Sequence, residues 1–195
     1  MKDKELTQEK ILEAVDSIIV NDGFERIGVN AIAQKAGVSK MLIYRYFGGL
    51  DELIAQYLLR KDYWANTDIR AIDGADVAGS LKRMFHEQIV QLRNDVTLRR
   101  LCRWELTADN ENTQQLRDSR ARNGCELIKA VSGFTHSSHT EVAALATILS
   151  AAISYLVLIE DQSPTYNGIN LQSDEGWEQI IKGIDLIIDL WIKQV

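Results

Sequence analysis

The sequence predicts an all-α protein with a three-helix helix-turn-helix head followed by a larger helical domain, in about nine helices. Three observations support this prediction. Apolar residues recur with helical spacing along most of the chain. Residues that interrupt helices are scarce, since the 195 residues include one proline and 12 glycines. A short N-terminal stretch has the helix–turn–helix pattern. We divide the domains at residues 1–48 and 49–195.

The composition allows a substantial core and limits where positive charge can lie. Hydrophobic residues make up 46% of the chain, and the formal net charge is −6. Residues 1–50 carry seven basic and seven acidic side chains, so the acidic excess lies in residues 51–195. A uniformly basic surface is therefore excluded, whereas a local basic surface on an acidic body is compatible with the sequence.

The start of the chain and its cysteines favour a cytoplasmic protein. The first ten residues, MKDKELTQEK, are too polar for a signal peptide. Cys102 and Cys125 are too few for a disulfide framework. We expect reduced, mostly buried thiols, with a redox-sensing pair as the alternative.

The N-terminal elements follow from apolar spacing and from the residues that start and end helices. A first helix is expected after Thr7, with its end at Gly23. A second helix ends at Gly37, which can adopt the positive φ that a tight turn needs. Ser39 then stands at the N-cap of a third helix, which runs to Phe47.

Helical spacing continues through the larger domain. Further helices are expected at about residues 50–64, 77–93, 97–108, 113–132, 140–161 and 177–191. Val142–Ile159 has no charge over 18 residues, the lower limit for a membrane span. Its small and polar residues, and its lack of terminal anchors, favour a central buried helix packed on several sides. Pro164, the only proline, opens a segment (163–174) that we expect to be a mobile loop.

Residues 29–47 have the pattern of a helix-turn-helix, whose second helix can enter a DNA major groove. All charged side chains between residues 26 and 50 are basic: Arg26, Lys35, Lys40 and Arg45. The alternative is an ordinary αα-hairpin with solvated lysines. Pattern, charge sign and chain position together favour DNA binding.

These residues resemble the DNA-binding head of TetR/AcrR-type bacterial transcriptional regulators. The resemblance covers about the first quarter of the chain and rests on Gly23-Phe24, Ile32-Ala33, Ala36-Gly37-Val38-Ser39-Lys40 and Ile43-Tyr44-Arg45-Tyr46-Phe47. Three places depart from the family pattern. Met41-Leu42 stands where Gly-Thr is common, Leu50 where lysine is common, and Gly28 where a hydroxyl residue is usual. The first departure bears on the operator sequence, and the other two remove phosphate or cap contacts.

The N-terminal part of such a second helix reaches base edges. Lys40 can donate to guanine or hold a phosphate, while Met41 and Leu42 suit thymine methyl groups. Leu42 can alternatively be a core residue. By resemblance to the family, Tyr44, Arg45 and Tyr46 mainly contact the DNA backbone. The predicted DNA-binding residues are Lys35, Ser39, Lys40, Met41, Leu42, Tyr44, Arg45 and Tyr46.

Polar residues interrupt the apolar stripes of the helices between residues 77 and 161, which is the pattern of a ligand pocket enclosed by helices. The predicted pocket residues are Phe85, His86, Trp104, Glu105, Arg120, Asn123 and Tyr155. Glu105 lies in phase with Leu98 and Leu101, so burial is expected, and an unpaired buried carboxylate is costly. It either orients a cationic or hydrogen-bond-donating effector or forms a salt bridge with an arginine such as Arg120.

The last helix has too much apolar surface to face water. We predict that it forms a two-fold interface with the preceding helix, giving a four-helix bundle across a homodimer. The predicted interface residues are Trp177, Ile180, Ile181, Ile184, Ile188 and Trp191.

The residues and the resemblance together predict a cytoplasmic, homodimeric transcriptional repressor. It binds a pseudo-palindromic double-stranded DNA operator and is released by a small-molecule effector. The alternative is a helical interaction module without operator-binding function. No membrane, metal or cofactor is expected, since His136 and His139 have no evident third ligand nearby. No nucleophile motif or phosphate-binding loop supports an enzyme.

Overall fold

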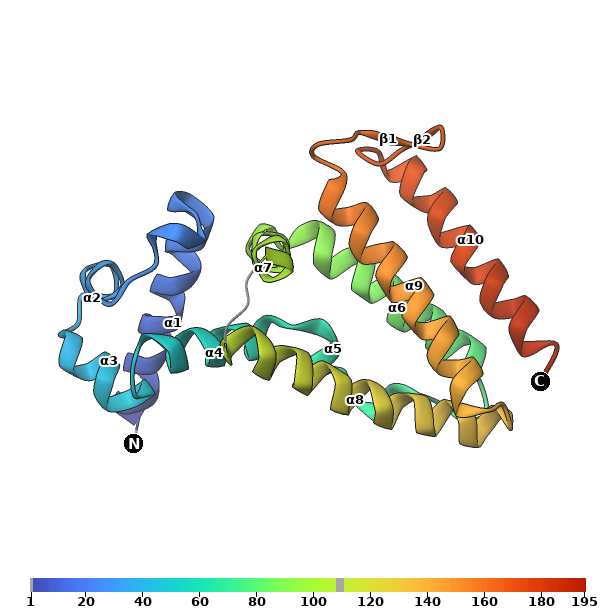
Figure 1. Ribbon diagram of the computed structural model, residues 1–195, viewed down its shortest axis with the longest axis horizontal. Helices are drawn as coiled ribbons and strands as arrows, with labels where there is room; N and C mark the ends of the chain where they lie inside the picture. The colour runs from blue at the N-terminus through green and yellow to red at the C-terminus, as the bar shows by residue number, and fades with distance from the viewer. Residues whose placement is uncertain (1, 108–110) are drawn as a thin grey trace. The chain divides into compact units, whose positions relative to one another are not determined.

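The computed structural model describes residues 2–107 and 111–195, and its elements are almost all helices (Figure 1). The predicted all-α fold with an N-terminal helix-turn-helix is confirmed. The elements are α1 (Lys2–Asp22), η1 (Phe24–Arg26), α2 (Val29–Ala36), α3 (Lys40–Phe47), α4 (Leu50–Lys61), α5 (Tyr63–Asn66), η2 (Ile69–Ala71), α6 (Val77–Asn94), α7 (Val96–Thr107), α8 (Glu111–Thr135), α9 (His139–Ile159), β1 (Thr165–Tyr166), β2 (Ile169–Asn170) and α10 (Asp174–Ile192).

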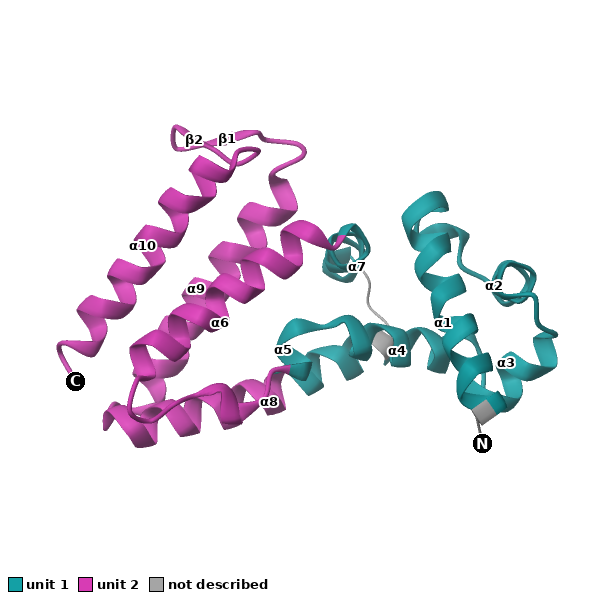
Figure 2. Cartoon of the chain, turned by 180° about the vertical axis from the view of Figure 1, so that it is seen from behind, with its two compact units in different colours: residues 1–66, 96–120 teal, residues 67–95, 121–195 magenta. Residues whose placement is uncertain are grey.

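The chain forms two compact units (Figure 2). Unit 1 comprises residues 1–66 and 96–120, and unit 2 comprises residues 67–95 and 121–195. Unit 1 therefore contains α4, α5, α7 and the first part of α8 in addition to the helix-turn-helix. The N-terminal compact unit thus extends beyond the first 48 residues.

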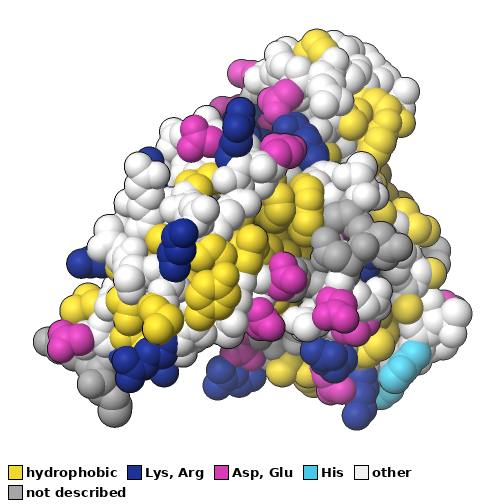
Figure 3. All heavy atoms as spheres, turned by 60° about the vertical axis from the view of Figure 1, so that its left-hand side comes forward, with side chains coloured by type: hydrophobic (Ala, Val, Ile, Leu, Met, Phe, Trp, Pro, Cys, Tyr) yellow, Lys and Arg dark blue, Asp and Glu magenta, His cyan; other side chains and the backbone are white. Residues whose placement is uncertain are grey.

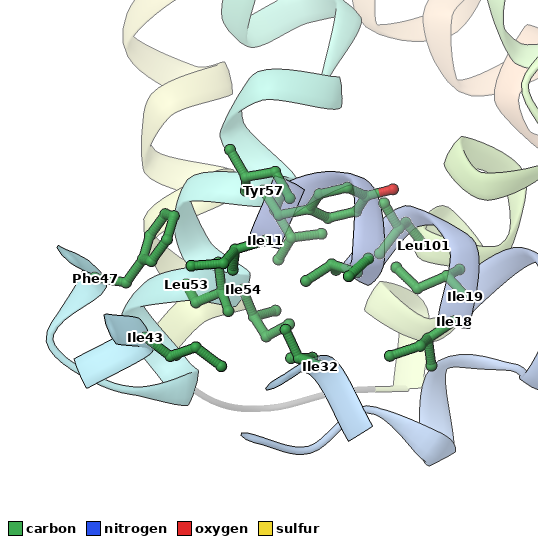
Figure 4. Close-up of a cluster of buried hydrophobic side chains, with 14 of the residues drawn as sticks. Ile11, Ile18, Ile19, Ile32, Ile43, Phe47, Leu53, Ile54, Tyr57 and Leu101 are labelled. Atoms are coloured by element: carbon green, nitrogen blue, oxygen red, sulfur yellow. The ribbon is translucent and has the colours of Figure 1, made fainter. Parts of the chain in front are cut away.

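The core of unit 1 joins the helix-turn-helix to helices from the middle of the chain. Branched and aromatic side chains of α1 to α4 converge in one cluster, which Leu101 of α7 and Leu116 of α8 complete. Burying a side chain of this kind contributes about 1.5–3 kcal/mol. Figure 4 labels Ile11, Ile18, Ile19, Ile32, Ile43, Phe47, Leu53, Ile54, Tyr57 and Leu101 in this cluster.

The turn between α2 and α3 has the predicted geometry. Gly37 is left-handed (φ 66°, ψ 34°), and its N–H donates to the carbonyls of Ala33 and Gln34. The N–H of Val38 also donates to Ala33, at 3.0 Å. Glycine adopts this backbone conformation without a Cβ clash. The turn at Gly37 and Val38 therefore provides hydrogen-bond donors for the last carbonyls of α2, and α3 can begin directly after it.

Unit 2 is built around α6, which packs against both α9 and α10. A salt bridge and a histidine–carboxylate hydrogen bond link α6 to α10. Lys82 Nζ lies 2.6 Å from Asp189, and His86 Nε2 lies 2.8 Å from Asp185. Residues four apart share a helix face, so the two pairs fix an antiparallel register one turn apart.

The segment 163–174, expected to be a mobile loop, contains a short antiparallel β-hairpin in which β1 pairs with β2. Asn167 (φ 48°) and Gly168 (φ 82°) form its two-residue turn. Asn-Gly suits such a turn, because both central residues need positive φ. Buried Leu171 anchors the segment, and its carbonyl accepts a 2.7 Å hydrogen bond from the Trp177 indole.

The start of α1 also differs from the prediction. The helix already includes Lys2, rather than beginning after Thr7. The Thr7 hydroxyl donates to the carbonyl of Asp3 at 2.7 Å, inside the helix. A threonine can satisfy its hydroxyl in this way within a helix, and its presence alone therefore does not mark a helix start.

Helix α9 is less buried in the single chain than its apolar sequence predicts. Among the described residues it is the one helix long and apolar enough to cross a membrane by length and composition, and 28% of its most apolar 18-residue window is buried. The prediction of packing on several sides is therefore wrong for the single chain. Beyond its first turn, the exposed positions of α9 share one face: Ala144, Thr147, Ile148, Ala151, Ala152 and Tyr155.

Candidate nucleic-acid interface

Helix α3 has a buried face and an exposed face. Ile43 and Phe47 lie in the core of unit 1, and Leu42 is half-buried at the boundary. By contrast, Met41 is 76% exposed and Tyr44 is 52% exposed. The exposed residues are Lys40, Met41, Tyr44 and Arg45. Because residues spaced by three or four lie on one side of a helix, these four can approach a groove together.

The N-terminal end of α3 offers hydrogen-bond donors. Ser39 is the N-cap residue, with an extended backbone (φ −74°, ψ 147°), and its hydroxyl makes no cap hydrogen bond. The first amides of a helix lack intrahelical acceptors and carry partial positive charge. These amides and the exposed hydroxyl can therefore donate to a phosphate oxygen.

Positive charge is concentrated locally in the helix-turn-helix and the turn before it. Arg26, Lys35, Lys40 and Arg45 are exposed, and none forms an ion pair within residues 2–107 and 111–195. Tyr46 is half-buried, with Lys4 Nζ 5.8 Å from its ring centroid. Acidic and basic side chains are interspersed over the face drawn in Figure 3. Attraction to DNA therefore depends on this local set.

Glu105 is ion-paired inside unit 1. Its buried carboxylate accepts from Arg120 Nη1 at 2.7 Å, and Arg120 Nε also donates to Asp62 at 2.6 Å. Burial alone lowers the pKa of Arg120, but hydrogen bonds to Asp62 and the charges of Asp62 and Glu105 outweigh it. The pKa is therefore raised above its usual value. Of the two predicted alternatives for Glu105, the salt bridge is the one found.

The pocket residues predicted in unit 2 have separate environments. His86 pairs with α10, and Asn123 Nδ2 donates to the carbonyl of Thr67 at 2.8 Å. Phe85 is buried in the core, whereas Tyr155 is exposed. Their participation in ligand binding stays a prediction.

Two open pockets lie at other positions. One, of about 570 Å³, is lined in unit 1 by residues of α1 and α4, including Glu13, Asp16 and Lys61. The other, of about 440 Å³, lies in unit 2 beside Phe134 of α8. Neither is lined by a predicted pocket residue.

The predicted interface residues of α10 divide between core and surface. Trp177, Ile184 and Ile188 are buried within unit 2, so their assignment to an exposed interface is wrong. The physical reason is that α10 uses this stripe to pack inside its own unit. Ile180, Ile181 and Trp191 are half-buried. The large apolar side chains of α10 that are exposed are Leu186, Ile187 and Leu190.

Comparison with known proteins identifies the helix-turn-helix. The profile of the family described as "Bacterial regulatory proteins, tetR family" matches residues 11–57, from α1 into α4. The chain therefore carries the DNA-binding head of the TetR-type regulator family. It is a DNA-binding transcriptional regulator, and α3 is the second helix of its helix-turn-helix. No curated protein matches the sequence.

Solved structures of TetR-type regulators share the fold. NalD of Pseudomonas aeruginosa, described as the secondary repressor of the MexAB-OprM multidrug efflux pump, is 15% identical with a TM-score of 0.64, covering 94% of this chain and 98% of its own. A TetR family regulator from Marinobacter aquaeolei is 21% identical with a TM-score of 0.64, covering 95% and 97%. One from Streptomyces coelicolor is 17% identical with a TM-score of 0.57, covering 97% and 99%.

Two departures from the TetR-type pattern can be placed in the structure. Gly28 is the N-cap of α2, with an extended backbone (φ −169°), and a Cβ there would meet no atom within 4 Å. Glycine is therefore not required at this position. Leu50, the first residue of α4, is half-buried and packs against the unit 1 core. Its side chain thus contributes to packing where a lysine would offer positive charge.

Contacts that hold the TetR-type head were missed by sequence reasoning. Arg100 received no role, although Nη1 donates to the carbonyls of Ile19 and Val20 at the end of α1. Trp104, predicted as a pocket wall, stacks on Phe24 with ring centroids 4.1 Å apart. The one local signal was that α1 has no basic residue in its last turn. Arg100, which binds this end of α1, lies 80 residues from Val20 in sequence, so no local pattern could pair the two.

Proposed function

We propose that this TetR-type regulator is a repressor that binds a pseudo-palindromic operator as a homodimer and is released by a small-molecule effector. The exposed face of α3 carries the proposal. Lys40 and Arg45 supply positive charge, Met41 and Tyr44 supply apolar and aromatic contact, and the opposite side of the helix is fixed in the core. This combination suits contact with base edges and phosphates together.

A two-fold operator follows from the small size of the reading surface. The helix α3 has eight residues, and those at its N-terminal end reach few bases. Specific recognition is gained when two such helices enter successive major grooves, about 34–36 Å apart. A dimer with two-fold symmetry then requires a pseudo-palindromic site.

The proposed dimer is supported by two exposed faces in unit 2. The exposed face of α9 is rich in small residues, with Ala144, Ala151 and Ala152 beside Ile148. The exposed face of α10 carries the larger residues Leu186, Ile187 and Leu190. In a two-fold arrangement, α10 of each chain can pack its large side chains onto α9 of the partner. Burial of these residues in the dimer would remove them from water.

The proposed effector response is supported by family membership and by analogy. NalD is described as a repressor of an efflux pump, and such a role requires release from DNA. The proposed effector is a small, largely apolar molecule that binds the regulatory helices. It releases DNA only if it binds the DNA-incompetent state more tightly. A tenfold loss of operator affinity requires about 1.4 kcal/mol of coupling. Operator binding further implies a cytoplasmic protein that is not an enzyme.

Selection of DNA duplexes from a randomised library tests the proposal. The wild-type protein should enrich a pseudo-palindrome, bind it as a dimer and repress a reporter that carries it. At matched salt, Lys40→Ala should weaken binding by about 1–3 kcal/mol, equivalent to roughly 5- to 150-fold. Tyr44→Ala should weaken binding as well. The exposed residue Lys129, in unit 2, provides a control for lost charge through Lys129→Met. Full affinity in both α3 variants would contradict the assignment, and failure to enrich any duplex would favour a helical interaction module.

A further inference from the structure

Helix α7 is part of the same packed body as the helix-turn-helix. Leu101 lies in the hydrophobic cluster beside Ile19 of α1, as Figure 4 shows. Helix α7 also contacts η1, the turn that connects α1 to α2. A displacement of α7 from this site would open the core that supports α2 and α3.

Arg100 binds the C-terminal end of α1. Its Nη1 donates to the carbonyl of Ile19 at 2.5 Å and to that of Val20 at 2.6 Å. The last carbonyls of a helix have no intrahelical donors and carry partial negative charge. No basic residue lies in the last turn of α1. Arg100 therefore supplies from α7 both the donor and the charge that this helix end lacks.

Trp104 contacts η1, the segment that follows α1. It lies four residues after Arg100, on the same side of α7, and stacks on Phe24 with an interplanar angle of 23°. Phe24 belongs to η1, and Gly23 (φ 89°) turns the chain into it from α1. Only Ile27 and Gly28 separate η1 from α2. The position of Phe24 therefore sets where α2, and after it α3, begins.

We propose that Arg100 and Trp104 are positioning residues for DNA recognition, so that α3 is held for operator binding only while α7 is docked on α1 and η1. The inference rests on the proposed operator binding and adds how that site is regulated. One residue, Asp95, separates α7 from α6, so α7 is also the chain's direct route from the regulatory helices of unit 2 to the head. An effector that withdraws α7 would release both contacts at once.

The test uses the full-length protein and the duplex that the wild type selects, at fixed salt and at a temperature where every variant is fully folded by circular dichroism. Arg100→Met removes the donors and retains side-chain length, and Arg100→Lys restores a cation that can reach a carbonyl. Trp104→Leu removes the stack. Lys129→Met is the control for the loss of one positive charge. Amide exchange over residues 18–28 is measured in the same variants without DNA.

The expected result is at least a tenfold weaker operator complex for Arg100→Met and for Trp104→Leu, with at least tenfold faster exchange over residues 18–28. Arg100→Lys should recover most of the affinity, and Lys129→Met should bind within about twofold of the wild type. A merely stabilising role would lower the melting temperature without changing affinity in fully folded protein.

Affinity of both variants within twofold of the wild type would overturn the inference and leave operator binding intact. Weaker binding with unchanged exchange would also overturn it, because the loss would not arise at α1 and η1. If the wild type selects no duplex, the proposed function and this inference fail together.

Discussion

Replacing Arg120 by methionine should destabilise the protein strongly, because two buried carboxylates would lose their nearest cation, and Glu105 would keep only the more distant contact with Arg117 at 3.6 Å. The side chains of Asp62 and Glu105 are only 5% and 10% exposed, and both contact Arg120. Removing one partner of a buried ion pair typically costs about 3–5 kcal/mol, since the remaining charge stays desolvated. For a chain of this size, that corresponds to a decrease in melting temperature of roughly 6–20 °C. Urea denaturation followed by tryptophan fluorescence measures the difference.

An exposed ion pair of the same unit provides the matched control. Arg60 and Glu9 lie 3.4 Å apart, with side chains 55% and 57% exposed. Solvent screens such a pair, so Arg60→Met should cost no more than about 1 kcal/mol. A variant that combines Arg120→Met with Asp62→Asn and Glu105→Gln removes the buried charges together and should recover most of the lost stability. If Arg120→Met costs no more than Arg60→Met, the account of this cluster as a desolvated charge network is refuted.

Three further outcomes follow from the structure. Gly28→Ser should stabilise the protein by about 0.4–1 kcal/mol, because the extended N-cap accepts a side chain and a glycine is lost from the unfolded chain; thermal denaturation measures this. Hydrogen bonds from the cap residue Ser138 lower the pKa of Glu141 below its ordinary 4.5. The capping box therefore stabilises the folded protein above pH 4.5, and this stabilisation is lost as the pH falls through the lowered pKa. The shift in denaturation midpoint caused by Ser138→Ala should thus be larger at pH 7 than at pH 3. Leu186→Asp should yield a folded monomer in sedimentation, whereas Lys129→Met, which makes the same change of net charge on α8, should remain dimeric.

The helix-turn-helix could be predicted because its determinants are local. A positive φ at Gly37, the N-cap position of Ser39 and the alternation of buried Ile43 with exposed Tyr44 are encoded within a few residues. The hairpin had an equally local signal in Asn167-Gly168, which the expectation of a loop after proline obscured.

The environment of the predicted pocket residues was harder to predict because it depends on distant partners. Spacing correctly placed Glu105 on a buried stripe, but it could not distinguish a ligand from Arg120 as the group that neutralises it. The same applies to Arg100 and Trp104, whose partners belong to α1 and η1. A hydrophobic period identifies which face is buried but not what buries it.

Helix α10 shows why helical spacing identifies an apolar helix without telling which of its faces the single chain buries. The helix is apolar on two faces, so helical spacing alone selects the longest stripe, which includes Ile184 and Ile188. The single chain buries that stripe in unit 2 and exposes Leu186 and Leu190 on another side. A charge at Ile184 would therefore be desolvated inside the unit and unfold it, whatever the oligomeric state. A charge at Leu186 would stay in water in the monomer and oppose association only. Loss of the dimer with retained helicity in Leu186→Asp is thus the observation that identifies this face as the interface, and a dimer that persists in this variant would exclude it.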